Sequence, residues 1–280
     1  MKLKNHLESI KATVYNAPSI DELKSYIPEF VCLTWLPEIG DLNEFMKSRD
    51  LTREQIVDEM FAGRTLPTAL ETVRVTMLLE GLDMTNVTHI IRHRMFSFSA
   101  QSTDPVSMAD HDILMNDAFL QHPKLVAKAK ILVEDANNLY NEALDAGLSY
   151  YDARHYMVRA KEAKYFMSGN VKDWIAFINV RLGRTNQPTS DNIIAMHCRR
   201  ELIKLYPQIK EQIPVEKLQM HYLKAINEKM NMNTYPPDRL HREWLRDHKV
   251  KWEAAEYNHK MPRDEYPHMD NFNRLVEELR

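Results

Sequence analysis

The run from Arg92 to Ser102, which reads RHRMFSFSAQS, holds the residue types best suited to ligand chemistry. Two arginines flank a histidine, and serine hydroxyls and one glutamine amide follow at short intervals. A guanidinium donates several hydrogen bonds in a planar fork that fits phosphate, whereas hydroxyl and amide groups can bond the carbonyl edge of a planar ring. The run therefore predicts a surface that binds an anionic ligand carrying a ring.

The segments before this run are expected to place it at a cleft. Apolar residues dominate Val75–Leu82 and then Val87–Ile91, so the run should leave a buried element and open outward. A second interpretation is an arginine-rich helix end that is simply solvated at the surface.

The spelling of the run resembles the signature of the flavin-dependent thymidylate synthases, in which Arg-His-Arg is followed by a serine after seven intervening residues, here Ser102. Further positions follow the order of that family, and the resemblance spans about residues 10–205. These positions are Glu71, Val75-Thr76-Met77, Glu80-Gly81, Ala153-Arg154, Asn170, Phe177, Arg181 and Gln187.

The resemblance implies three overlapping sets of site residues. The substrate-binding set is His89, Arg92, Gln101, Ser102, Arg154 and Arg181. The flavin-binding set is Glu71, Arg92, His93, Arg94, Asn170 and Lys172. The catalytic set is Arg181, Arg92 and Ser102. An arginine at the ring oxygens of a pyrimidine stabilises the negative charge that makes C5 nucleophilic, most effectively in a desolvated site.

The function implied by the resemblance is C5 methylation of a pyrimidine deoxynucleotide monophosphate, dUMP to dTMP in the first place. FAD is the implied cofactor, and methylenetetrahydrofolate and NADPH are the implied co-substrates. The alternatives are a dCMP C5 methylase, a hydroxymethylase of dUMP or dCMP, and a non-catalytic relative that only binds nucleotide. The family also implies a homo-oligomer, in particular a tetramer, whose subunits share site residues.

The sequence departs from the family where the phosphate of the substrate is expected. Asp104-Pro105 stand where the family has Arg-Tyr, and a carboxylate at about 4 Å from a phosphate costs roughly 1 to 4 kcal/mol. Ala100, Ala176 and His89 also replace residues that the family usually carries as polar or amide side chains. The phosphate is therefore held by another residue or placed differently, and the choice between dUMP and dCMP stays open.

Three of the implied residues also have ordinary structural explanations. Taken alone, Arg154 is explained as a surface residue of a helix, and Asn170, which follows Gly169, as a helix cap. Arg181 is explained as the ion-pair partner of a carboxylate. Their occurrence together with the Arg92–Ser102 run favours the ligand-binding interpretation.

The composition excludes several other classes. Of 280 residues 44% are hydrophobic and 28% charged, and the net charge of -3 gives no general attraction to nucleic-acid polymers or anionic membranes. The sequence has no run of about 18 apolar residues and no signal-peptide core at its start, so a cytoplasmic protein is expected. Cys32 and Cys198 are expected to be buried free thiols, and no metal site is expected. Neither a Rossmann glycine motif nor a P-loop occurs.

The expected fold class is α+β, mostly helical around a small mixed β-sheet, with a helical C-terminal extension. The sequence contains only six glycines, and this scarcity favours long helices with few tight turns. We expect a main domain over residues 1–210 and a helical or irregular extension over 211–280, which begins helically near Val215. Capping residues predict helix starts after Ser19 and Thr52. Apolar periodicity predicts a strand over 71–80 and helices over 84–91, 123–146, 151–167, 171–182 and 191–205.

Overall fold

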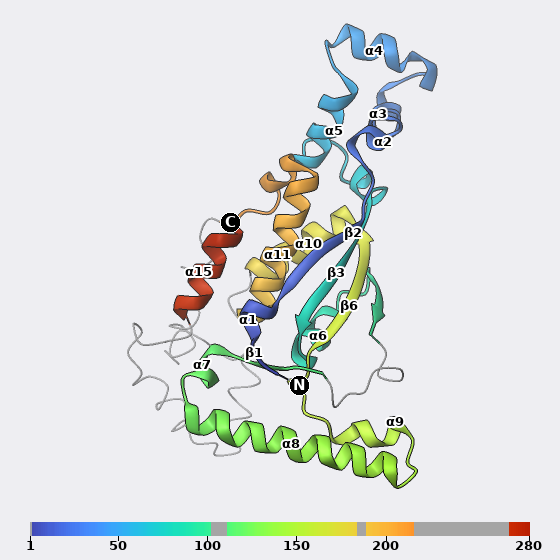
Figure 1. Ribbon diagram of the computed structural model, residues 1–280. Helices are drawn as coiled ribbons and strands as arrows, with labels where there is room; N and C mark the ends of the chain where they lie inside the picture. Colours follow the sequence, from blue (N-terminus) through green and yellow to red (C-terminus); the bar gives the residue numbers. More distant parts are fainter. Residues whose placement is uncertain (1, 102–110, 184–188, 216–268) are drawn as a thin grey trace, which may run out of the picture.

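The computed structural model describes residues 2–101, 111–183, 189–215 and 269–280 (Figure 1). Its centre is a four-stranded antiparallel sheet in the order β2-β3-β6-β4. These strands are β2 (Lys11–Asn16), β3 (Arg74–Leu82), β6 (Ala163–Asn170) and β4 (Ser97–Ala100). Two short strands, β1 (Leu3–Asn5) and β5 (Ile113–Met115), form a separate parallel pair. The prediction of an α+β fold around small sheets is therefore confirmed.

One face of the sheet carries the core. Along β3 the side chains of Val75, Met77 and Leu79 are fully buried, whereas the alternate positions are exposed or half-buried, as the two-residue period of a strand requires. Helices α10 (Val171–Gly183) and α11 (Thr189–Leu205) pack together on this face (Figure 1). Both confirm predicted helices.

Apart from β1 and β2, the elements before β3 are short helices. They are α1 (His6–Ser9), α2 (Ile20–Lys24), α3 (Ile27–Cys32), α4 (Leu42–Ser48) and α5 (Arg53–Phe61), with 3-10 turns η1 (Leu33–Trp35), η2 (Ile39–Asp41) and η3 (Pro67–Glu71). Ser19 and Thr52 each close a capping box, with Glu22 and Gln55, so both predicted helix starts are confirmed. The predicted strand over 71–80 begins only at Arg74, because Pro67 starts a 3-10 turn before it.

The longest described helix, α8 (Pro123–Asp145), lies apart from the sheet beside α9 (Tyr150–Ala153) (Figure 1). It confirms the prediction over 123–146. Helix α6 (Met84–Ile90) confirms the helix before the arginine run, and α7 (Asp117–Leu120) leads into α8. Among the described residues, no helix is both long enough and apolar enough to cross a bilayer.

The predicted helix over 151–167 is wrong. Helix α9 stops at Ala153, a 3-10 turn η5 (Arg154–Tyr156) follows, and β6 then pairs with β3 on one side and β4 on the other. The segment around Lys161 to Lys164 is rich in good helix formers. Tertiary pairing overrides this preference, since a central strand satisfies its backbone groups through both neighbours.

The end of the chain returns to the core. Helix α15 (Met269–Leu279) packs on α11, with Phe272 and Val276 fully buried. The predicted helical continuation after Val215 lies outside the described residues, so the domain boundary at 210/211 stays a prediction.

Candidate functional site

The arginine run leaves the buried helix α6 in a series of tight turns. The N–H of His93 donates to the carbonyl of Ile90, and the N–H of Phe96 donates to the carbonyl of His93. Phe96 is buried edge-on against Trp174, with ring centroids 4.8 Å apart, and fixes the run to the core. Arg92 and Arg94 are exposed on either side of a half-buried His93. Both arginines are therefore accessible to a ligand, and their role in binding one stays a prediction.

The structure brings His89, His93 and Arg181 together around a buried carboxylate. Nη1 of Arg181 donates to Oδ2 of Asp191 at 3.2 Å, and Nη2 donates to the carbonyl of His89 at 2.6 Å. The same Nη2 lies 3.0 Å from Nε2 of His93. Because a guanidinium only donates, His93 accepts at Nε2 and a neutral ring carries its proton on Nδ1. The structural explanation of Arg181, a carboxylate partner, is thus realised, and its contact with substrate stays a prediction.

Asp191 is itself held by a polar network that sequence reasoning missed. The side-chain amide of Asn86 donates to Oδ1 of Asp191 and to Oγ of Ser190, both at 2.8 Å, and Nδ1 of His89 donates to Oδ2 of Asp191 at 2.8 Å. Nε2 of His6 lies 2.9 Å from the amide oxygen of Asn86. Asn86 and Asp191 are almost fully buried. Asp191 therefore positions both Arg181 and His89.

The predicted flavin residues Glu71, Asn170 and Lys172 lie at one end of the sheet. Glu71 and Lys172 form an ion pair whose side chains are half-exposed. The side-chain oxygen of Asn170 accepts from the N–H of Asp173 at 2.8 Å, so Asn170 does cap the first turn of α10. Arg74, opposite Asn170 in the sheet, donates to the hydroxyls of Ser168 and Ser97 at 3.0 and 3.2 Å. This end of the sheet is rich in donors.

The predicted substrate residues Gln101 and Arg154 line a single cleft of about 620 Å³ at the other end of β4. Cations outnumber carboxylates there, since Arg154, Arg159 and Lys161 face one Glu162. Glu162 also forms an ion pair with Lys4, whose Nζ lies 2.8 Å from Oε2 of Glu162. The remaining lining residues are Met84, Ala100, His111, His155, Met157, Val158, Ala163 and Tyr165. The cleft therefore suits a ligand with a negative charge.

His111 also lines this cleft, although no sequence motif predicted a role for it. Its Nδ1 lies 2.8 Å from the carbonyl oxygen of Glu162, so Nδ1 carries a proton. Its Nε2 is buried and has no hydrogen-bond partner among the described residues. In the neutral ring Nε2 is an acceptor for a ligand N–H or O–H, and in the charged ring it is a donor. The sequence pointed to this cleft through Gln101 and Arg154, whereas nothing in it singled out His111.

Strand β4 connects the two ends. Ser97 pairs with Ser168 near the flavin candidates, and the N–H of Gln101 donates to the carbonyl of Lys164 at the cleft, 3.0 Å away. Four residues of strand span about 13 Å. The predicted substrate residues thus include a cleft group, Gln101 and Arg154, and a second group at Asp191, the half-buried His89 and the buried Arg181, whereas Arg92 is exposed. Ser102, Asp104 and Gln187 lie outside the described residues.

Neither cysteine has the environment of a nucleophile. Cys198 on α11 is fully buried, and this burial raises the pKa of its thiol far above the ordinary range. Burial also raises the pKa of Cys32. Both are free thiols, as predicted. In the described part of the chain no group of three or more His, Cys, Asp or Glu side chains is arranged to hold a metal ion.

Comparisons with known proteins agree with the motif. The profile of the family described as thymidylate synthase complementing protein matches residues 31–208. The flavin-dependent thymidylate synthase of Corynebacterium efficiens is 23% identical over 164 residues, 53% of this chain and 65% of that protein. The probable flavin-dependent thymidylate synthase of Paramecium bursaria Chlorella virus 1 is 27% identical over 139 residues, 44% of this chain and 64% of that protein. The matched regions thus span less than two thirds of these relatives.

A solved structure shares the fold. The UMP/dUMP methylase PolB from Streptomyces cacaoi, bound with 5-Br dUMP, superimposes with a TM-score of 0.58 at 17% identity, over 76% of this chain and 96% of that one. At this identity the likeness concerns the fold.

Proposed function

The chain belongs to the family of thymidylate synthase complementing proteins, and from this premise we propose that it methylates dUMP at C5 to give dTMP, in a flavin- and folate-dependent reaction. The observation that carries the proposal is the cationic cleft in which Gln101 and Arg154, two residues expected to bind substrate, lie side by side with Arg159, Lys161 and His111. Relatives named flavin-dependent thymidylate synthases and the nucleotide bound to PolB support it.

The proposal assigns the monophosphate to the cationic cleft. Guanidinium and ammonium groups bind phosphate through charge-assisted hydrogen bonds, and the cleft places Arg154, Arg159 and Lys161 around one cavity. These cations take over the task of the family arginine that Asp104 replaces. His111 supplies a further acceptor or donor for the sugar or the base.

Activation of the pyrimidine requires an arginine at its ring oxygens. C5 becomes nucleophilic when negative charge collects on O2 or O4, and a fixed guanidinium in a water-poor site stabilises that charge. Arg181 is almost fully buried and is oriented by Asp191, so it is preorganised for this task. Arg92 is exposed next to His93 in the chain and is assigned to bridge the substrate and flavin.

The residues at the donor-rich end of the sheet fit a flavin. Arg92 and Arg94 are exposed cations, and Lys172, paired with Glu71, and Asn170 are polar groups at that end of the sheet. We assign Glu71, Arg92, His93, Arg94, Asn170 and Lys172 to FAD. When bound, the flavin supplies the two electrons that turn the methylene unit of methylenetetrahydrofolate into a methyl group, with NADPH as the source of reducing equivalents.

The proposal includes a cytoplasmic homotetramer whose subunits complete one another's sites. Within the described part of one chain, Gln101 and Arg154 line the cationic cleft, whereas His89 and Arg181 meet at Asp191. A second copy of the chain that brings its own residues to the cleft would join the two groups, as symmetric oligomers often do.

Arg94→Ala should purify colourless, whereas the wild-type protein should be yellow. Losing a guanidinium that makes charge-assisted bonds to an anionic cofactor weakens binding by about 1.5 to 3 kcal/mol, or ten- to hundredfold. The measurement is the visible flavin absorbance per polypeptide after purification. Lys47→Ala, which removes an exposed cation of α4 that lines neither described pocket, is the control and should keep its flavin. A fully loaded Arg94→Ala protein would remove the arginine run from the flavin site.

A further inference from the structure

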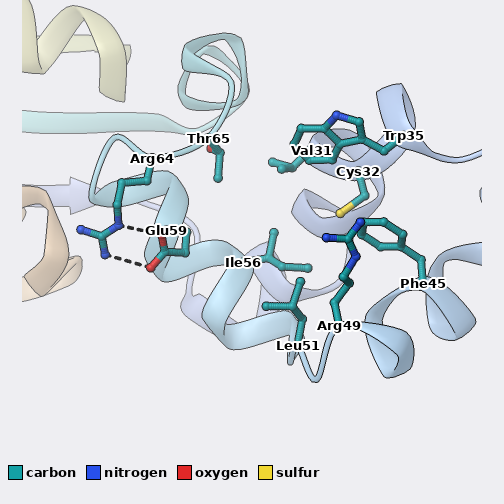
Figure 2. A pocket seen from close by; sticks show the side chains of 10 residues that line it. All are labelled: Val31, Cys32, Trp35, Phe45, Arg49, Leu51, Ile56, Glu59, Arg64 and Thr65. Carbon is teal, nitrogen blue, oxygen red and sulfur yellow. Dashed lines mark hydrogen bonds and ion pairs between the residues drawn. The ribbon is translucent and has the colours of Figure 1, made fainter.

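A second pocket lies among α3, α4 and α5, at the end of the molecule opposite α8 (Figures 1 and 2). Its volume is about 600 Å³, in the range that encloses a small organic ligand. It shares no lining residue with the cationic cleft. The residues around it are Val31, Cys32, Trp35, Phe45, Arg49, Leu51, Ile56, Glu59, Arg64 and Thr65.

The walls of this pocket are apolar and aromatic. Trp35 has 60% of its surface exposed although it borders a pocket, and the Phe45 ring is only half-buried. Figure 2 shows both rings on the side of Cys32, with Ile56 and Leu51 along the base. An exposed tryptophan beside a ring-sized cavity is stabilised when another planar ring covers it. The walls therefore favour a flat, aromatic occupant.

Of the two arginines that line the pocket, Arg49 is the one available to bind an anion. Arg64 is neutralised twice, by Glu59 at 2.6 Å and by Glu211 at 2.7 Å. Arg49 has no carboxylate partner among the residues that the structure describes, and its guanidinium carbon lies 5.6 Å from the centre of the Phe45 ring. A guanidinium held over an aromatic face keeps its donors for an anion. The occupant should therefore carry one negative group.

Two further atoms define the interior. Oγ1 of Thr65 is buried and makes no hydrogen bond to any described residue, so it offers an unused donor and acceptor. Thr65 lies on the side of Glu59 and Arg64, away from Arg49 (Figure 2). Burial raises the pKa of the Cys32 thiol, so this side chain adds to the uncharged part of the pocket wall.

We propose that this pocket is a second ligand site, separate from the cationic cleft, and that it binds a planar aromatic anion. The ring packs on Trp35 and Phe45, the anionic group pairs with Arg49, and a polar ring substituent meets Thr65. The site does not depend on the proposed methylation.

The test uses 8-anilinonaphthalene-1-sulfonate and its uncharged analogue N-phenyl-1-naphthylamine as fluorescent probes of the full chain. Arg49→Gln should weaken binding of the sulfonate about tenfold and change binding of the neutral probe less than twofold. Trp35→Leu should weaken both. Lys47→Gln, which removes an equally exposed charge from the same helix but does not line the pocket, should change neither.

Two results would overturn the proposal. One is equal affinity of the sulfonate for the wild type, Arg49→Gln and Trp35→Leu. The other is displacement of the probe by excess dUMP, since that would put the probe in the cationic cleft. Thermal unfolding of each variant confirms that the fold is intact. None of these readouts requires flavin or turnover, so failure here leaves the proposed methylation unaffected.

Discussion

Asp191→Asn should lower the free energy of unfolding by about 3 to 5 kcal/mol, because it leaves the buried Arg181 charge without its counter-charge. Arg181 and Asp191 are both almost fully buried, and Oδ2 of Asp191 accepts from Arg181 and from His89. An amide in this place presents only one acceptor oxygen and no charge. Urea denaturation of the two proteins, followed by circular dichroism, measures the difference.

The double variant Arg181→Met with Asp191→Leu separates structure from catalysis. Replacing a buried ion pair by apolar side chains of similar size is often neutral, so most of the stability should return. Activity should not return, because the guanidinium assigned to the pyrimidine is gone. An Asp191→Asn protein as stable as the wild type would contradict the first expectation. A stable and active double variant would show that Arg181 is only structural.

Gly81→Ala should be destabilised by about 2 to 4 kcal/mol. Gly81 has φ +71, a conformation that other residues adopt at a cost of about 1 kcal/mol. A Cβ here would also lie 2.2 Å from the carbonyl oxygen of Ser9 and 2.7 Å from the backbone nitrogen of Ile10. These backbone atoms cannot rotate away, and overpacking of this kind adds about 1 to 3 kcal/mol. Thermal or urea unfolding measures the loss.

Gly147→Ala is the matched control. Gly147 has φ +85, but nothing lies within 4 Å of a Cβ added there. It should lose only the conformational cost of about 1 kcal/mol. Equal losses for the two variants would mean that the close approach of β3 to the chain at Ser9 and Ile10 is not a constraint on the fold.

Local signals in the sequence were sufficient to predict those helices that depend on residues close together in the chain. The apolar stripe of α8, the capping boxes at Ser19 and Thr52, and the helix that ends before Arg92 all appear as predicted. Each depends on residues three or four positions apart, which is the range over which helix periodicity and capping act. The position of the arginine run at the end of α6 follows from these signals.

Pairing across long separations was the part that the sequence did not reveal. β6 is a strand because β3 lies on one side and β4 on the other, about ninety and seventy residues away in the chain, although the helix formers from Lys161 to Lys164 favour a helix where it begins. Asp191 and His111 were missed for the same reason. Their roles depend on Arg181, Asn86 and the carbonyl of Glu162, which only the folded chain brings near.

The central claim is tested most directly by the product that the wild-type protein forms. The flavin-loaded protein is incubated with NADPH, methylenetetrahydrofolate and either dUMP or dCMP, and the nucleotides are identified by mass spectrometry. We predict dTMP from dUMP and no change in dCMP, because an arginine has only donors and suits the O4 of uracil better than the exocyclic amine of cytosine. A methyl or hydroxymethyl group on dCMP alone, or no product from either nucleotide, would contradict the account.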